Sequence, residues 1–353
     1  MLSSTVMGEA NEYTRSCRRQ FRSIQKFDKF RFIDKLKAFP EQVENAYNIE
    51  LPKLPEFKFD NIVVTGMGGS AIGGELLSAW ALRELGRIIF VSRDYELPNF
   101  VDKNSLVFAI SYSGNTEETL NAFSEALARK CKIIAVTSNG RLAKLALQHK
   151  IPLVKIPKDY QPRQAIAYLL LPIARILERF GIVKFGTDDA VSTLRNLRAN
   201  LIPENEANNV SKELALKLKN KIPIVYGHSY LYPVARRWKT QLNENSKVIA
   251  FASSFPEMCH NEIVGLNKDK NTNRFFHIIL RSADENEQLS KKIGITKKLV
   301  LKNSAEVYAQ GNSTISKMLS LIYIGDFTSY YLALLRKVDP TPVEIIEKLK
   351  KLL

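Results

Sequence analysis

The stretch Asn61–Gly74 (NIVVTGMGGSAIGG) decides the fold. Its first five residues form a short, apolar and β-branched run that predicts a strand, and this run leads straight into a glycine-rich turn. The same order returns at Ser105–Thr119 (SLVFAISYSGNTEET), where a predicted strand over Ser105–Ser111 ends in a turn rich in serine and threonine. Both turns open a predicted helix, as strand-to-helix turns do in α/β proteins.

Helix-length segments separate the predicted strands of the first half. We expect a helix over Glu75–Leu85 after the first turn and another through Lys130 after the second. Strands spaced in this way pair in parallel, with helices covering both faces of the sheet. The other expected elements are strands at Arg87–Ser92, Lys132–Thr137 and Ile151–Ile156, an apolar helix at Ala165–Phe180 and a linker at Gly181–Asp189.

The second half has the same alternation. A polar helix is expected around Leu194–Lys219 and two long helices at Ser316–Arg336 and Pro342–Leu352. Strands are expected at Pro223–Tyr226, Val248–Ala252, Phe275–Leu280 and Lys298–Leu301. The sequence therefore predicts an α/β protein with two doubly wound, three-layer αβα sandwich domains over residues 26–185 and 190–353, preceded by a poorly ordered extension over residues 1–25.

Composition excludes several classes of function. The net charge of +16 favours anionic partners, but the lysines are spread along the chain and no nucleic-acid-binding motif accompanies them. No apolar run reaches the roughly 18 residues that a membrane span needs. Three cysteines, Cys17, Cys131 and Cys259, form no CxxC pair, so neither a disulfide framework nor a metal site is expected. We expect a cytoplasmic protein without nucleic-acid or membrane partners.

The glycine-rich turn permits two interpretations. Gly66, Gly68 and Ala71 fit the dinucleotide pattern G-x-G-x-x-A. That pattern also requires an acidic residue at the end of the next strand for the ribose hydroxyls. Here Arg93 stands at that point, with Asp94 behind it, so a dinucleotide is disfavoured.

The second turn favours a phosphate monoester. Ser111, Ser113 and Thr116 cluster where a helix begins, and free backbone N–H groups with hydroxyl donors suit an anion there. Gly69 and Ser70 of the first turn can converge on the same point, because both turns follow parallel strands. The alternative is that these hydroxyls only cap a helix. Two such turns on neighbouring strands favour phosphate binding.

Longer motifs resemble a known family. GMGGSAIGGEL and SYSGNTEET resemble the sugar isomerase (SIS) domain, and the chain from about Lys26 onward is similar to the bifunctional phosphoglucose/phosphomannose isomerase family. The further motifs that carry this resemblance are FPEQ (Phe39–Gln42), QPRQAIAYL (Gln161–Leu169), QLNENSK (Gln241–Lys247), HNEIVG (His260–Gly265), GDFTSYYLALL (Gly325–Leu335) and VDPTPVEIIEKLK (Val338–Lys350). They occur in order over nearly the full length.

The resemblance implies roles for residues that composition alone would not single out. Glu244, which otherwise looks like one half of an ion pair on a basic helix, corresponds to the proton-transferring base. His260 corresponds to a ring-opening histidine that reaches the active site of a partner subunit in a homodimer. Cys259 stands beside it where the family often has asparagine, which puts a supporting hydrogen bond in doubt.

Three further residues complete the implied set. Lys350 corresponds to the ring-opening lysine, although the match near the terminus leaves Lys348 and Lys351 open, and a helix-end lysine can simply complement the helix dipole. Arg163 would neutralise the charge of an enediolate, or else pair with a nearby carboxylate. Thr341 is expected to affect substrate specificity.

The implied activity is an aldose–ketose isomerase. It would interconvert glucose 6-phosphate or mannose 6-phosphate with fructose 6-phosphate through a cis-enediol, with no metal and no cofactor. The alternative is a non-catalytic sugar-phosphate sensor, which would need the phosphate turns without Glu244, His260 and Lys350. Such sensors usually carry a DNA-binding appendage, and 25 residues are too few for one. Sugar aminotransfer would require a glutamine-hydrolysing domain, for which Cys17 has no suitable context.

Overall fold

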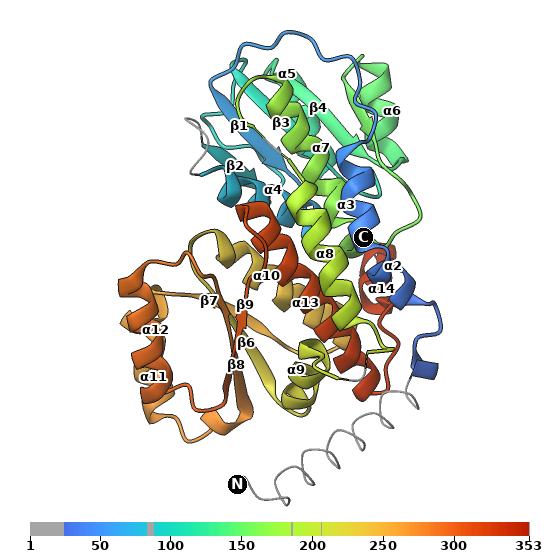
Figure 1. Ribbon diagram of the computed structural model, residues 1–353. Helices are drawn as coiled ribbons and strands as arrows, with labels where there is room; N and C mark the ends of the chain where they lie inside the picture. Colours follow the sequence, from blue (N-terminus) through green and yellow to red (C-terminus); the bar gives the residue numbers. More distant parts are fainter. Residues whose placement is uncertain (1–24, 83–87, 185, 206, 353) are drawn as a thin grey trace, which may run out of the picture. The chain divides into compact units, whose positions relative to one another are not determined.

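The computed structural model describes residues 25–82, 88–184, 186–205 and 207–352, and it contains two compact units (Figure 1). Residues 39–191 form one unit, called the first unit below. Residues 192–353 form the second unit, together with the segment that ends at Ala38. The predicted N-terminal extension and Cys17 lie outside the described residues, apart from Gln25.

The first unit is built on a five-stranded parallel sheet of order β2-β1-β3-β4-β5. Its strands are β1 (Asn61–Thr65), β2 (Ile89–Ser92), β3 (Ser105–Ile110), β4 (Lys132–Thr137) and β5 (Leu153–Lys155), and its helices are α3 (Phe39–Tyr47), α4 (Gly68–Ala81), α5 (Glu117–Ala128), α6 (Gly140–Gln148), η2 (Pro162–Gln164) and α7 (Ile166–Arg179). Alternate strand residues such as Val63 and Val107 pack under α5 and α6. Val64 points to the other face, against α4, so both faces are buried, as the apolar strands predict.

The second unit contains a four-stranded parallel sheet of order β7-β6-β8-β9. Its strands are β6 (Ile222–Gly227), β7 (Phe251–Ser254), β8 (Phe275–Arg281) and β9 (Ser304–Tyr308). Its helices include α2 (Phe32–Lys37), α9 (Val210–Leu218), α10 (Tyr232–Ser246), α11 (Glu262–Lys268), α12 (Glu287–Leu299), α13 (Thr314–Leu335) and α14 (Glu344–Leu352), with short turns η1 (Gln25–Phe27), η3 (Ser229–Leu231), η4 (Glu257–His260) and η5 (Thr272–Arg274). Helix α8 (Asp188–Leu201) begins inside the predicted linker.

Helix α13 is the centre of the second unit. Almost all of its residues are buried, and it packs on α9 and α10. It also holds α2, because Phe32 stacks on Tyr330 with ring centroids 6.3 Å apart and the Tyr323 hydroxyl donates to the Leu36 carbonyl over 2.9 Å. Among the described residues, α13 is the one helix long and apolar enough to cross a membrane, and its apolar window is 100% buried within the protein.

Most predicted elements are confirmed, but three boundaries in the second half are wrong. The strand expected at Lys298–Leu301 belongs to the end of α12 and the residues after it, and the edge strand is β9 instead. The helix expected at Leu194–Lys219 is two helices, α8 and α9, separated by a segment that contains Pro203. Strand β7 starts at Phe251 rather than Val248, because Lys247 ends α10 in a left-handed conformation and the Val248 N–H donates to the Leu242 carbonyl as part of that helix cap.

The helix after the glycine-rich turn is also longer than predicted. The helix expected at Glu75–Leu85 begins at Gly68, so that Gly69, Gly73 and Gly74 lie inside α4 rather than in a loop. Its predicted end at Leu85 lies outside the described residues. Glycine lowers helix propensity, so sequence alone favours a later start. A Cβ at Gly73 would approach the Leu169 carbonyl oxygen to 2.7 Å, and this close packing against α7 compensates for the propensity.

Gly325 in α13 offers a test of the α10–α13 packing. A Cβ there would lie 2.4 Å from the ring of Trp238, whose indole N–H donates to the Leu321 carbonyl over 2.8 Å. Alanine in a helix interior normally gains about 0.5–1 kcal/mol over glycine, whereas overpacking costs about 1–3 kcal/mol. We therefore expect Gly325→Ala to lower the melting temperature, measured by calorimetry.

The matched control is Gly294→Ala in α12, where a Cβ would meet nothing within 4 Å. This substitution should keep the propensity gain and raise the melting temperature slightly. An increase for Gly325→Ala as large as that for Gly294→Ala would contradict the proposed tight packing.

Candidate functional site

The strand order in the sheet of the first unit reverses between β1 and β3. The chain goes from β1 to β2 on one side and then crosses to β3 on the other, so β1 and β3 are neighbours with parallel register. In open α/β sheets, ligands bind at this point, outside the carboxyl ends of the strands. Both predicted phosphate turns begin here, and a Cβ on Gly66 would lie 2.9 Å from the Ile110 carbonyl oxygen. The expected convergence of the two turns therefore has a geometric basis.

The first turn lies directly against the segment that carries Arg163. A Cβ on Gly69 would come within 3.0 Å of the Pro162 carbonyl oxygen and 3.7 Å of the Arg163 Cα. Ser70, one residue later in the first turn of α4, is only 5% exposed. The absence of a side chain at Gly69 thus lets the backbone at Arg163 reach the start of α4.

Arg163 is held in place by amide side chains. It lies in η2, where the Gln161 and Gln164 side chains form a capping box, and it is 3% exposed. Gln42 of α3 donates to the Gln164 carbonyl over 2.9 Å and accepts from the Ala167 N–H over 3.3 Å. Two of the motifs that carry the resemblance, around Gln42 and Arg163, therefore meet in one hydrogen-bonded corner.

The second turn is ordered from inside by Ser111. This residue is fully buried, and its Oγ accepts from the N–H groups of Gly114 (3.1 Å) and Thr116 (3.4 Å). The Ser111 and Thr116 hydroxyls also lie 2.8 Å apart. Ser113 is exposed, and its Oγ accepts from the Asn115 N–H over 3.3 Å. Ser111 therefore shapes the turn, whereas Ser113 and Thr116 are more accessible to a ligand.

A neighbouring loop fixes the same turn from outside. Gly114 adopts a positive φ of 70°, and a Cβ there would lie 1.7 Å from the Asn139 carbonyl oxygen. The Arg141 N–H donates to the Asn115 side chain over 3.0 Å. The turn after β3 is therefore locked to the turn after β4, which leaves the first N–H groups of α5 in a fixed orientation.

The structure gives no support to a dinucleotide at this edge. Arg93, at the end of β2, forms an ion pair with Glu75 of α4. The Asp94 carboxylate accepts from the Tyr95 N–H over 2.7 Å. Neither side chain at the end of β2 therefore takes the role of the acidic residue that binds a ribose.

Glu244 lies on α10 in the second unit, and a buried polar network fixes that helix. Arg237 donates to Asp326 of α13 over 2.8 Å, and Gln241 donates to the same carboxylate over 3.0 Å. Asn245 donates to the Ser329 hydroxyl over 2.9 Å. The sequence motif Gln241–Lys247 pointed to this helix but not to Asp326, whose signal was a lone carboxylate in an otherwise apolar helix.

The segment that contains Thr341 is tied to the end of α10. The Lys247 ammonium donates to the Glu244 carbonyl over 2.5 Å and to the Pro340 carbonyl over 3.3 Å. The Thr341 N–H donates to the Asp339 carboxylate over 2.9 Å. Lys247 thus brings the backbone beside Thr341 close to that of Glu244.

His260 and Lys350 are both exposed. His260 ends η4, and neither a hydrogen bond nor an ion pair joins it to Glu244 among the described residues. Lys350 lies on α14, whose exposed apolar residues Ile345, Leu349 and Leu352 follow helical spacing. The structure of the chain alone therefore does not bring Glu244, His260 and Lys350 into hydrogen-bonding contact.

The segment around His260 is anchored by residues to which the sequence motifs assigned no role. Glu262, two residues after His260, accepts from the Tyr226 hydroxyl over 3.2 Å and bonds Ser253. Cys259 contacts Thr296 of α12, with Sγ and Oγ1 3.3 Å apart. The HNEIVG motif contained Glu262, but only the tertiary structure shows its partners.

In the second sheet the strand order reverses between β6 and β8. Side chains of the protein occupy the space at this point. Arg281 donates to both carboxylate oxygens of Glu285 over 2.9 Å and also bonds Glu306. His228 Nε2 lies 3.4 Å from Glu285, and burial lowers the pKa of this histidine. Carboxylates of the chain therefore occupy the position that an anion would take, and the second sheet lacks an open phosphate turn at this edge.

Within the described residues, no group of three or more His, Cys, Asp or Glu side chains is arranged to hold a metal ion.

Comparison with known proteins gives matches over most of the chain. A model described as the bacterial phospho-glucose isomerase C-terminal SIS domain matches residues 207–353, and an SIS domain model matches residues 57–166. A bifunctional phosphoglucose/phosphomannose isomerase of Caldicellulosiruptor bescii is 42% identical over 323 residues, covering 88% of this chain and 95% of that protein. A D-glucosamine-6-phosphate 4-epimerase of Sulfolobus acidocaldarius is 31% identical, covering 88% and 94%.

Similarity also extends to solved structures. The crystal structure of a hypothetical protein from Thermus thermophilus matches with a TM-score of 0.71 at 16% identity, covering 98% of this chain and 96% of that one. At this identity the match supports the predicted two-domain α/β fold alone.

The two serines of the second turn should respond differently to alanine. Ser111→Ala removes a buried acceptor from the Thr116 and Gly114 N–H groups, which costs about 1–3 kcal/mol. We expect a lower melting temperature and faster amide hydrogen exchange at Thr116, measured by mass spectrometry. Ser113→Ala, at an exposed position, is the control and should change stability by less than about 0.5 kcal/mol. Equal melting temperatures for the two variants would remove the ordering role of Ser111.

Proposed function

Because the chain belongs to the bifunctional phosphoglucose/phosphomannose isomerase family, we propose that it interconverts glucose 6-phosphate and mannose 6-phosphate with fructose 6-phosphate. The observation that carries this proposal is the 42% identity, over 95% of its length, to a relative named a bifunctional phosphoglucose/phosphomannose isomerase. The relatives are enzymes by name, which favours catalysis over a sugar-phosphate sensor.

We propose that the two turns of the first unit bind the substrate phosphate. Gly69 and Ser70 would contribute from the start of α4, and Ser113 and Thr116 from the start of α5, with Ser111 holding the second turn in shape. Backbone N–H groups at a helix start favour negative charge. Hydroxyl donors add hydrogen bonds without adding a fixed cation, which would suit repeated binding and release of a monoester.

Glu244 is the proposed proton-transfer base. Its carboxylate would take the proton from C2 of the aldose and return it to C1, while the hydroxyl proton moves between the two oxygens, so that atoms and charge balance through a cis-enediol. The Arg237–Asp326 contact supports this role, because it fixes α10 from its buried side. The buried guanidinium of Arg163 would stabilise negative charge on the enediolate oxygen.

His260 and Lys350 are the proposed ring-opening pair, with Lys348 and Lys351 as alternatives for the lysine. The cyclic sugar needs one group to remove the C1 hydroxyl proton and one to protonate the ring oxygen. An imidazole titrates near neutrality and can take either part. The enediol leaves C2 planar, so the proton can return to either face, and Thr341 is proposed to help accommodate both epimers.

The surface around His260 supports a homodimer in which this residue serves the neighbouring active site. Strand β7 is an edge strand of its sheet. Ile249 just before this strand, Phe251 at its start and Val264 on α11 are exposed, at 71%, 49% and 65%. An exposed edge with large apolar side chains is typical of an interface surface. A second copy of the chain would cover it.

We further propose a cytoplasmic location, because Cys131 and Cys259 are free cysteines in the structure. The proposed chemistry uses only proton-transfer groups and so requires no metal and no cofactor.

Glu244→Gln tests the proposed base. We expect kcat to fall by about 10²–10⁴ because the amide cannot accept the carbon-bound proton. A coupled assay from fructose 6-phosphate should follow glucose 6-phosphate and mannose 6-phosphate separately. The matched control is Glu213→Gln, an equal charge change at an exposed position of α9, which should keep full activity.

Three outcomes would oppose the proposal. Full turnover by Glu244→Gln would remove Glu244 from its role. Loss of wild-type activity in EDTA, restored by a divalent cation, would contradict the metal-free mechanism. Turnover of glucosamine 6-phosphate at C4, with none from fructose 6-phosphate, would assign the chain the reaction named for the Sulfolobus acidocaldarius relative instead.

Mixed dimers test the sharing of His260. Glu244→Gln and His260→Ala proteins should each be nearly inactive as purified. If His260 acts across the interface, a heterodimer contains one intact site, and random exchange of subunits should restore about a quarter of wild-type activity. Recovery is measured after mixing under mild denaturation and refolding. No recovery, with mixed dimers shown by mass spectrometry, would place His260 in the active site of its own chain.

A further inference from the structure

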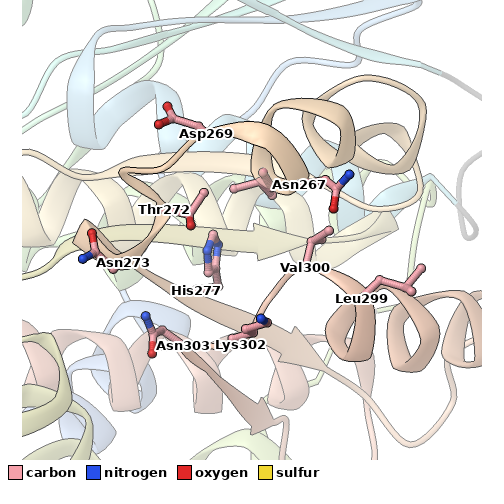
Figure 2. Close-up of a pocket in the computed structure, with 10 residues that line it drawn as sticks. Asn267, Asp269, Thr272, Asn273, His277, Leu299, Val300, Lys302 and Asn303 are labelled. Atoms are coloured by element: carbon pink, nitrogen blue, oxygen red, sulfur yellow. The ribbon is translucent and has the colours of Figure 1, made fainter.

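A pocket of about 290 Å³ lies at the amino ends of β8 and β9 in the second unit (Figure 2). It is lined by the end of α11, the η5 turn, the end of α12 and the residues before β9. This position is at the opposite end of the strands from Arg281, the last residue of β8, and from Glu285, which follows it. None of its residues takes part in the proposed isomerisation.

His277 forms the buried part of the pocket wall. It is 2% exposed, and burial lowers its pKa to about 4, so the imidazole is neutral at physiological pH. Its Nδ1 is shielded from solvent and has no hydrogen-bond partner among the described residues. A buried polar atom without a partner costs about 1–3 kcal/mol, which a structural residue would normally avoid. Figure 2 shows the ring projecting from β8 between Thr272 on one side and Asn303 and Lys302 on the other.

Further polar side chains that could bind a ligand lie around His277. Within the described part of the chain, the side chains of Asn267, Thr272 and Asn303 make no hydrogen bond. Leu299 and Val300 add apolar surface to the same pocket. Amide and hydroxyl groups beside an aliphatic wall match a ligand whose body is neutral and carries its own hydrogen-bonding groups.

Charge is found at the rim of the pocket. Lys302 lines it and is exposed, and Lys268, Lys270 and Arg274 are exposed neighbours in sequence of its lining residues. The one lining carboxylate, Asp269, already accepts from the Asn271 N–H over 2.7 Å. Inside, the carbonyl ends of α11 and α12 disfavour an anion. A negative group would therefore stay at the rim with the lysines.

We propose that this pocket binds a phosphorylated metabolite, with its neutral body against His277 and its phosphate beside Lys302. A nucleotide and a sugar phosphate both have this chemistry. The site goes beyond the proposed isomerase function, since it is separate from every residue assigned to that reaction.

The pocket is connected to His260 by two routes. Asn267 lies near the end of α11, and that helix begins two residues after His260. The His277 ring also packs on Tyr226, with centroids 5.8 Å apart, and the Tyr226 hydroxyl donates to Glu262 over 3.2 Å. Occupancy of the pocket should therefore change the environment of His260, as expected for an effector site.

The test uses the full-length protein labelled with ¹⁵N-histidine, which has only four histidines. His277→Phe identifies the His277 signals, because they disappear in this variant. If it does not fold, Asn303→Ala is the second variant with an altered pocket wall. The probes are AMP, adenosine, fructose 6-phosphate and inorganic phosphate. We expect AMP, fructose 6-phosphate or both to shift the His277 ring signals in a saturable way. AMP should also shift His260 by a smaller amount, whereas fructose 6-phosphate should shift His260 directly when it binds the proposed active site.

Two lysine variants distinguish a specific contact of the phosphate with Lys302 from a general effect of the positive charge on binding. Lys302→Gln should weaken binding of the phosphorylated probe about tenfold and leave adenosine binding unchanged. Lys291→Gln, an exposed lysine of α12 outside the pocket, is the control and should bind like the wild type.

The arms give distinct outcomes. A shift by AMP with none by fructose 6-phosphate at His277 assigns a nucleotide, and the reverse assigns a sugar phosphate. No shift at His277 up to about 100-fold the protein concentration, or equal affinity for inorganic phosphate alone, overturns the proposal. Loss of isomerase activity in Glu244→Gln leaves these signals unaffected, so failure of one proposal is distinguishable from failure of the other.

Discussion

The close approach of α4 to its neighbours is the constraint on which the first unit depends. A side chain at Gly73 would collide with the backbone of α7 at Leu169, and one at Gly69 would make a tight contact with the backbone of η2 at Pro162. Without these side chains the helix start, the corner that holds Arg163 and the end of β1 come together at one edge of the sheet. The turn that we propose to bind phosphate is thus a consequence of backbone packing, and its hydroxyl groups are added to a geometry that glycine makes available.

The four strands of the second sheet follow the same order as the first four of the first sheet, but the point where that order reverses differs between the two units. In the first unit, backbone N–H groups and hydroxyls lie at that point. In the second unit, Arg281 is already paired with Glu285, so the corresponding position is satisfied from within. One copy of the fold is therefore suited to an anionic ligand. In the other copy, carboxylates of the chain occupy the place of an anionic ligand. That copy carries Glu244 on a helix that Asp326 anchors.

Much of this arrangement follows from local sequence. Strands β1, β3 and β4 could be predicted almost to the residue because apolar, β-branched runs bounded by turn residues have few alternatives. The end of α12 could not, since Leu299 and Leu301 are apolar in a helix end as well as in a strand. The start of α4 could not either, because propensity disfavours glycine in a helix, and only the proximity of Leu169 explains it.

The sequence by itself determined the fold class, the two strand-to-helix turns and the family, because these depend on periodicity and on motifs that are contiguous in the chain. Tertiary structure alone decided that Ser111 orders its turn from within, that Asp326 fixes the helix of Glu244, and that His277 Nδ1 is buried in the wall of a pocket without a hydrogen-bond partner among the described residues. The hydrogen bonds of Ser111 are local, but its burial depends on distant residues, as do the contact of α10 with Asp326 and the surroundings of His277. Packing sets these distances and burials. No local pattern contains that information.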